Sequence, residues 1–239
     1  MRNNIIFSCS ILILLFCACK KGNGDHKHHK AHDHHKKHDH NDANTHMNKS
    51  SLEELESRFE SAERLITQKP YEVIALFGDL KGKKIMDIGA GTGYFTFKLA
   101  EKGAEVIAGD VSDEFQEYIR HKMKTLKIPN TQLKLRKLHY DDPLLYEEEV
   151  DGAIVVNTYH HIDQRVPYFS KVRNGLRPQG LLMIVDFMKK EFENEVPGPP
   201  IEMRISSDEV IQELRESGFT NIELDETLLP FQYIVKAYK

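Results

Sequence analysis

A strand-like segment, a glycine-rich turn and a helix-like segment follow one another between Lys84 and Ala100. The apolar segment contains one acid, Asp87, and it breaks into a turn whose alternate residues, 89, 91 and 93, are glycine. Glycine has no Cβ and adopts positive φ, so backbone here can approach a ligand closely. Open α/β sheets bind nucleotide-like cofactors at such turns, which follow the carboxyl ends of parallel strands. The segment therefore predicts an α/β fold with a cofactor at this turn.

The rest of the chain supports this fold class, because apolar segments alternate with amphipathic ones. Such alternation is typical of a parallel sheet that helices cover on both faces. The predicted strands are 105–109, 132–136, 150–157, 181–187, 222–224 and 233–238, and the predicted helices are 50–66, 70–77, 111–122, 166–176 and 207–217.

Two further positions narrow the choice of cofactor. A dinucleotide fingerprint, G-x-G-x-x-G, requires glycine at position 94, where the chain has Tyr94, which disfavours a nucleotide-binding oxidoreductase. Asp110 ends the next apolar strand, 19 positions after Gly91. An acid at this distance accepts hydrogen bonds from ribose hydroxyls. Asp110 therefore predicts a nucleoside ligand, with a helix N-cap as the alternative role.

The pattern D-x-G-x-G-x-G at residues 87–93 resembles motif I of the class I S-adenosylmethionine (SAM) methyltransferases. Leu176-Arg-Pro before the fifth strand and Glu216-Ser-Gly-Phe219 resemble further motifs of that family, so the resemblance runs from about residue 69 to the C-terminus. It implies a Rossmann-like doubly wound sheet, seven-stranded and mostly parallel, with an antiparallel C-terminal hairpin. The cofactor-binding residues that the resemblance implies are Asp87, Gly89, Ala90, Gly91, Gly93, Asp110, Val111, Asp141 and Asn157.

In that family the tip of the fourth strand lies beside the methyl donor and the acceptor. Here the tip carries Asn157, Tyr159, His160 and His161. The last three are the candidate catalytic residues, since they could shape the acceptor site or take a proton from it. The alternative for each histidine is a structural hydrogen bond.

The N-terminal sequence indicates a targeting segment. A short basic start and an apolar run over residues 5–16 suit a signal peptide better than a membrane span of about 20 residues. Ala18-Cys19 resembles a bacterial lipoprotein signal, which implies a membrane anchor through lipid on Cys19 and a location facing the periplasm or the cell surface. The alternatives are cleavage elsewhere and an uncleaved anchor. If the signal is absent, the protein is cytoplasmic, which is where SAM is made and used.

Residues 20–49 are rich in Lys, His and Asp, with almost nothing to bury, and predict a disordered linker between the signal (1–19) and a methyltransferase domain (50–239). Dense imidazoles bind Zn²⁺, Ni²⁺ or Cu²⁺ without a fold. A metal-binding surface lipoprotein with a non-catalytic domain is therefore the alternative function, and a plain hydrophilic tether the alternative role of the tract. The candidate metal ligands are His26, His28, His29, His32, His34, His35, His38 and His40, with His46 nearby.

The net charge of the chain limits the kinds of molecule that it is expected to bind. The formal net charge is −4, and no basic surface studded with aromatic residues is evident, so a small-molecule or lipid-like methyl acceptor is favoured over RNA or DNA. The acceptor itself and the oligomeric state do not follow from the sequence.

Overall fold

Seven strands form one sheet in the order β3-β2-β1-β4-β5-β7-β6. Neighbours from β3 to β5 pair in parallel, and β7 pairs antiparallel with both β5 and β6. This confirms the predicted Rossmann-like doubly wound sheet with its antiparallel C-terminal hairpin. The computed structural model describes residues 52–193 and 198–239. The strands are β1 (Lys84–Ile88), β2 (Glu105–Asp110), β3 (Leu133–Lys137), β4 (Val150–Val156), β5 (Leu176–Phe187), β6 (Thr220–Asp225) and β7 (Gln232–Tyr238).

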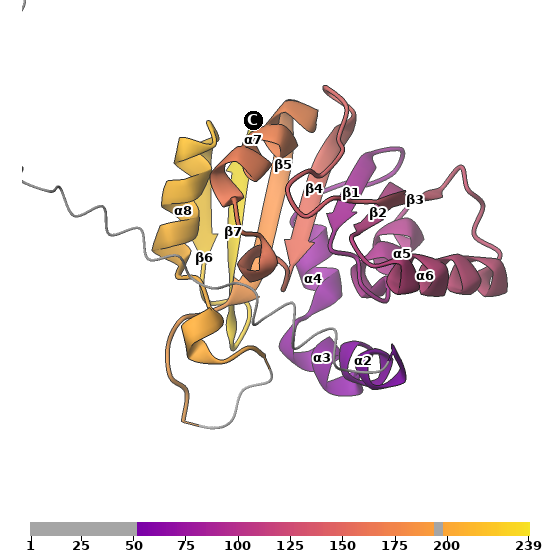
Figure 1. The fold of residues 1–239 in the computed structure, drawn as a ribbon, viewed down its shortest axis with the longest axis horizontal. Helices are drawn as coiled ribbons and strands as arrows, with labels where there is room; N and C mark the ends of the chain where they lie inside the picture. The colour runs from indigo at the N-terminus through magenta and orange to yellow at the C-terminus, as the bar shows by residue number, and fades with distance from the viewer. Residues whose placement is uncertain (1–51, 194–197) are drawn as a thin grey trace, which may run out of the picture. The chain divides into compact units, whose positions relative to one another are not determined.

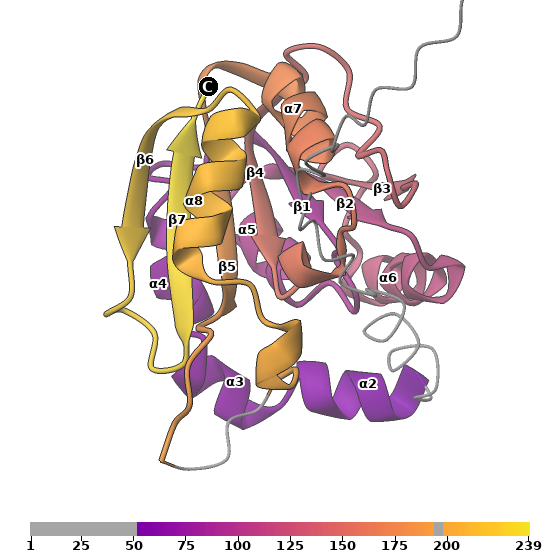
Figure 2. The same ribbon diagram turned by 60° about the vertical axis from the view of Figure 1, so that its left-hand side comes forward.

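Helices cover both faces of the sheet, as Figures 1 and 2 show. On one face α4, α5 and α6 pack against the sheet, and α7 and α8 lie on the other, because each parallel crossover returns over the sheet with the same hand. The helices are α2 (Leu52–Phe59), α3 (Ala62–Thr67), α4 (Pro70–Ala75), α5 (Tyr94–Glu101), α6 (Asp113–Leu126), α7 (Arg165–Gly175) and α8 (Ser207–Glu216), with 3₁₀ turns η1 (Tyr159–His161) and η2 (Ile201–Met203).

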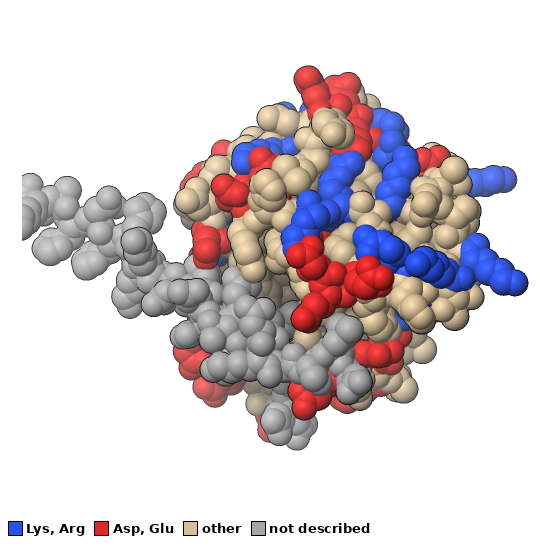
Figure 3. Space-filling view, turned by 45° about the vertical axis from the view of Figure 1, so that its right-hand side comes forward, with Lys and Arg blue, Asp and Glu red and all other residues tan. Residues whose placement is uncertain are grey.

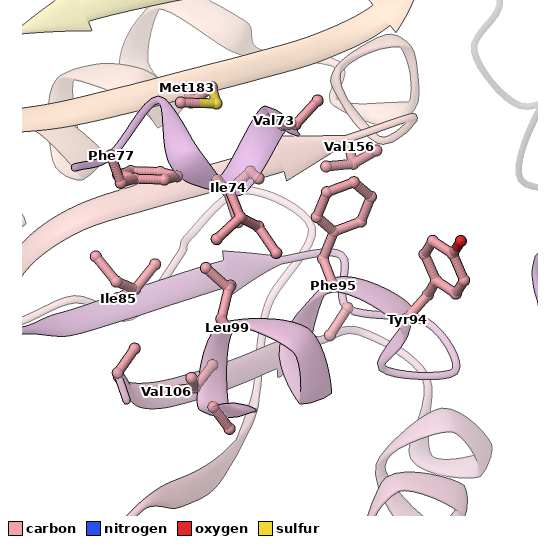
Figure 4. Close-up of a cluster of buried hydrophobic side chains, with 14 of the residues drawn as sticks. Val73, Ile74, Phe77, Ile85, Tyr94, Phe95, Leu99, Val106, Val156 and Met183 are labelled. Carbon is pink, nitrogen blue, oxygen red and sulfur yellow. The ribbon is translucent and has the colours of Figure 1, made fainter. Parts of the chain in front are cut away.

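Two apolar clusters, one on each face, hold these layers together. In the first cluster Ile74 of α4 and Phe77, two residues after its end, lie against Ile85 of β1 and Leu99 of α5 (Figure 4). The second contains Phe169 of α7 and the β4 and β5 side chains that point the other way. The central strands are buried on both faces, which explains why they read as continuous apolar runs rather than as alternating ones.

The structure differs from the prediction at two element boundaries. The first predicted helix is two helices, because Ser61 ends the run and its side chain accepts a hydrogen bond from the Arg64 amide as the N-cap of α3. Residues 177–180, which separate the predicted helix 166–176 from the predicted strand 181–187, are instead a bulge inside β5, where pairing with β4 passes from Leu176 directly to Leu181.

The predicted signal peptide and histidine-rich linker lie outside the described residues. Among the helices of residues 52–193 and 198–239, none has the length and apolar character needed to cross a membrane.

Candidate functional site

The glycine turn connects β1 to α5 and folds over the end of β2. The amides of Gly89 and Ala90 both donate to the Gly109 carbonyl, at 2.9 and 3.0 Å. Gly89 has a φ of 75°, and a Cβ there would lie 2.3 Å from Oγ1 of Thr158, just beyond β4. The close approach of the turn to the β4 tip therefore requires glycine at position 89.

Asp110 fastens this turn to β2. Its Oδ2 accepts a hydrogen bond from the Gly91 amide and its Oδ1 one from the Ser112 amide, both at 2.8 Å. The side chain is 5% exposed, and burial raises the pKa of the carboxyl, although the two amides oppose that shift. Each oxygen accepts one of these bonds and keeps a further lone pair for a ligand hydroxyl.

The alternative role of Asp110, a helix N-cap, belongs to Ser112, whose side chain accepts from the Phe115 amide at the start of α6. Val111, between them, is partly buried and packs against the apolar cluster on the α7 side of the sheet.

Asp87 lies beneath the turn, in β1. It is 2% exposed, and its Oδ2 accepts a 2.6 Å hydrogen bond from the Thr96 hydroxyl in α5. Burial raises its pKa from 3.8 to about 6, against the Thr96 hydrogen bond, which lowers it. This contact ties α5 to β1, and the left-handed Gly93 (φ 82°) begins the helix. Asp87 therefore stabilises the glycine turn by fixing α5 against β1.

The tip of β4 is joined to the N-terminal helices by three amide side chains. Asn157, with a φ of 54°, accepts at Oδ1 from Nε2 of Gln232 at 2.5 Å. Oε1 of Gln232 accepts in turn from Nε2 of Gln68 at 3.1 Å. Gln68 and Gln232 are almost fully buried. This amide relay holds α3 beyond the carboxyl ends of the strands, where α2 and α3 lie in both ribbon views (Figures 1 and 2).

His160 follows the β4 tip and is oriented by an acid from β5. Its Nδ1 lies 2.9 and 3.0 Å from the two carboxylate oxygens of Asp186, and its side chain is 4% exposed. A carboxylate accepts hydrogen bonds only, so Nδ1 carries the proton and Nε2 holds a lone pair. Among residues 52–193 and 198–239, Nε2 has no hydrogen-bond partner. The pair can therefore accept a proton at Nε2 while Asp186 stabilises the resulting cation.

Tyr159 and His161 flank His160 in the sequence, and Tyr159 has different contacts. Tyr159 is fully buried, stacks on Phe169 at a centroid distance of 4.9 Å and donates its hydroxyl to Glu213 of α8. Burial and this carboxylate raise the pKa of Tyr159 far above its ordinary value. These contacts make Tyr159 a packing residue rather than a group that could exchange a proton with an acceptor. The His161 ring lies 4.3 Å from that of His160, measured between centroids.

Asp141 does not lie beside the glycine turn. It is exposed in a loop after β3, where its carbonyl accepts a hydrogen bond from Lys171 of α7. The residue that follows β3 directly is Leu138, which is buried and donates its amide to the Asp110 carbonyl at 2.8 Å. An apolar side chain therefore stands beside Asp110 where the sequence analysis expects an acid.

No metal site accompanies these groups. Within the part of the chain that the structure covers, no cluster of three or more His, Cys, Asp or Glu side chains could hold a metal ion. The histidine-rich tract that carries the predicted metal ligands lies outside that part.

Sequence reasoning missed Asp186, Gln68 and Gln232. Asp186 carries the same signal as Asp110, an acid that ends an apolar strand, and this signal could have found it. The two glutamines carry no signal, because their roles depend on contacts between segments more than 150 residues apart in the chain.

Part of the chain is similar to known methyltransferases. Residues 85–180 match a family described as "Methyltransferase domain". An uncharacterized methyltransferase of Mycobacterium tuberculosis is 30% identical over 118 residues, which cover 48% of this chain and 44% of that protein. The chain therefore matches less than half the length of this curated relative.

Solved structures share the fold. A SAM-dependent methyltransferase from Aquifex aeolicus superposes with a TM-score of 0.70 at 23% identity, covering 80% of this chain and 99% of that one. Magnesium protoporphyrin IX methyltransferase from Synechocystis, determined with bound SAM, gives a TM-score of 0.62 at 16% identity, covering 84% and 96%. The methyltransferase-domain match runs from β1 to the middle of β5 in the sheet described above, and the chain has the fold of these SAM-dependent methyltransferase structures.

Proposed function

We propose that this protein binds SAM at the carboxyl ends of β1, β2 and β4 and transfers its methyl group to a small-molecule acceptor. The observation that carries the proposal is the buried carboxylate of Asp110, which pins the glycine turn through the Gly91 amide. Asp110 retains lone pairs for the two ribose hydroxyls, and no ion pair within residues 52–193 and 198–239 occupies it. The residues present thus fit a nucleoside cofactor.

Other residues would hold the rest of the cofactor. The backbone of the turn, Gly89 to Gly91, lies close enough to β4 for a ligand that spans both elements. Asn157 offers an amide at the β4 tip, and the amide relay through Gln232 sets its orientation. The SAM bound in the Synechocystis enzyme supports the choice of cofactor, because that protein has the same fold.

When bound, SAM supplies a methyl group on a sulfonium, which is already an excellent leaving group. The chain's own contribution is therefore alignment of the acceptor and exclusion of water, for which α2 and α3 lie beyond the strand ends. A hydroxyl acceptor must also lose its proton. We assign this step to Nε2 of His160, with Asp186 as the positioning residue that fixes the tautomer and stabilises the cation.

A small acceptor agrees with the surface. On the face that Figure 3 shows, Lys and Arg side chains form rows, but Asp and Glu side chains interrupt them. Together with the net charge of −4, this arrangement gives no continuous basic track for a nucleic-acid backbone on that face.

Calorimetric titration of SAM into the full chain in mild detergent tests the cofactor assignment. We expect binding that weakens about tenfold or more in Asp110→Asn, since the amide accepts ribose hydroxyls less strongly than a carboxylate. The matched control is Asp113→Asn, whose side chain is 88% exposed at the start of α6 and should leave binding unchanged. Absence of binding, or equal weakening by both variants, contradicts the proposal.

The role of His160 is tested separately, with a panel of phenols and alcohols as acceptors and radiolabelled SAM as donor. His160→Gln should lose about a hundredfold or more in kcat while SAM affinity changes little. Unchanged kcat would remove His160 from the reaction without affecting the cofactor assignment.

Membrane attachment through lipid on Cys19 completes the proposal. It rests on the N-terminal sequence alone, which lies outside the described residues. Metabolic labelling with a fatty acid should mark the wild type and not Cys19→Ser. Equal labelling of the two proteins, or none of either, contradicts the anchor.

A further inference from the structure

A pocket of about 260 Å³ lies beside the N-terminal end of α5. Its walls come from three helices and the connection before them, with Glu60 from the α2–α3 connection, Ala62 and Leu65 from α3, Phe97 and Lys98 from α5, and Lys122 from α6. None of Asp110, Asn157 and His160 lines it. The lining differs from the proposed cofactor site at these three residues and shares Gly93, the last glycine of the turn, with it.

The charge of the lining is positive. Lys122 forms an ion pair with Glu60 across the pocket, whereas Lys98 pairs with no carboxylate among residues 52–193 and 198–239. Two cations and one carboxylate leave a net charge of +1. The Lys98 ammonium donates one hydrogen bond, to the Tyr94 carbonyl at 3.3 Å, which leaves two N–H groups for a ligand. The lining therefore suits a monoanion.

Tyr94 adds an unused hydrogen-bonding group. The residue is 8% exposed and lines the pocket, and its buried hydroxyl has no hydrogen-bond partner in the described part of the chain. In Figure 4 the hydroxyl points away from the neighbouring apolar side chains. Lys98 Nζ lies 3.5 Å from the centroid of the same ring. A buried polar group without a partner is costly, and a ligand oxygen would satisfy it.

Apart from Ser61, whose side chain caps α3, the remaining walls are apolar. The ring of Phe97 lies against Gly93, where an added Cβ would come within 2.6 Å of it. Ala62 and Leu65 form the opposite side, and Leu65 is 49% exposed although it is a large apolar residue. These side chains offer contact to a hydrocarbon or aromatic body but no hydrogen bonds.

We propose that this pocket is a second ligand site, which binds a small organic acid with an apolar body. The carboxylate of the ligand accepts hydrogen bonds from Lys98 and from the Tyr94 hydroxyl, and the apolar body lies between Phe97 and Leu65. Because Glu60 and Lys122 join the α2–α3 connection to α6 at the same place, the ligand also bridges the N-terminal helices to the α5–α6 layer.

The test uses 4-fluorobenzoate as the probe, observed by ¹⁹F NMR with the full chain, and 4-fluorobenzamide as a neutral probe of the same shape. We expect saturable binding of the acid at millimolar concentrations or below, about tenfold tighter than that of the amide, since charge-assisted hydrogen bonds are the stronger ones. Lys98→Met should weaken binding of the acid about tenfold and Tyr94→Phe about fivefold. Lys102→Met, an exposed lysine at the end of the same helix, is the matched control and should change it less than twofold.

Three results of these binding measurements would overturn the proposal, and a competition experiment gives a fourth. The three are an absence of saturable binding, equal affinity for the acid and the amide, and binding that Lys98→Met leaves intact. The product S-adenosylhomocysteine should not displace the acid. Competitive displacement would place the probe in the cofactor site and would also refute a second site, while leaving the proposed methyltransferase function standing.

Discussion

Replacement of Asp87 by Asn should change how the stability of the fold depends on pH. Asp87 is buried under the glycine turn, and its pKa rises from 3.8 to about 6 because burial penalises the carboxylate. Below pH 3.8 the carboxyl is protonated in both folded and unfolded chains. As the pH rises through about 6, the unfolded chain is already ionised and the folded chain must ionise in a buried position, so this contribution to stability is lost.

The size of the loss follows from the two pKa values. At about 1.36 kcal/mol for each pH unit between 3.8 and about 6, ionisation of Asp87 costs the folded state about 3 kcal/mol. Asn stays neutral, has a similar volume and can still accept the Thr96 hydrogen bond through Oδ1. Relative to the wild type, Asp87→Asn should therefore gain about 2.5 kcal/mol of unfolding free energy between pH 4 and pH 7.5, because part of the loss has already occurred at pH 4.

Urea denaturation of both proteins at half-unit steps of pH measures this difference, and taking the difference cancels titration elsewhere in the chain. Asp113→Asn, at an exposed site, should follow the wild type throughout. A free-energy difference between Asp87→Asn and wild type that stays constant from pH 4 to pH 7.5 would refute the reasoning.

Three other substitutions test the site through stability. Gly89→Ala should lower the unfolding free energy by about 2 kcal/mol more than Gly82→Ala does, because both glycines have positive φ but only a Cβ at position 89 meets Thr158. Equal losses of unfolding free energy would show that the turn can relax. Tyr94→Phe should leave the unfolding free energy unchanged or raise it by about 1 kcal/mol, since the lost hydroxyl has no partner; a loss above about 1 kcal/mol in thermal or urea unfolding would reveal one. Gln232→Ala should cost about 1–3 kcal/mol by the same urea assay, because it leaves the buried amide of Gln68 unpaired, and a neutral effect would show that the amide relay is not needed.

The sequence predicts those parts of the site that depend on local pattern. Gly89, Gly91 and Gly93 all have positive φ, as glycines in a tight turn between a strand and a helix should. Asp110 is the last residue of β2, so its distance along the chain fixes its place beside the turn. The alternation of apolar segments predicted a parallel sheet covered on both faces, and the family resemblance supplied the antiparallel hairpin that closes it.

Contacts between distant segments could not be predicted in this way. The partner of His160 is 26 residues away on β5, and Gln232 reaches Asn157 only because β7 inserts beside β5. Asp141 illustrates the opposite error, since its spacing suggested a ligand but the chain turns after Leu138 and leaves it exposed. Tyr159 stands at the β4 tip as the pattern implies, yet its ring packs inward because Phe169 and Glu213 receive it.

Hydrogen–deuterium exchange of the full chain with S-adenosylhomocysteine tests the central claim most directly, because it locates the ligand as well as detecting it. The amides of Gly91 and Ser112 both bond to Asp110, and α3 lies beyond the strand ends. Slower exchange is therefore expected in peptides that cover 89–96, 110–113 and 62–68, and it should disappear in Asp110→Asn. Unchanged exchange at saturating ligand, or protection confined to residues 20–49, would contradict the assignment of the cofactor to this site.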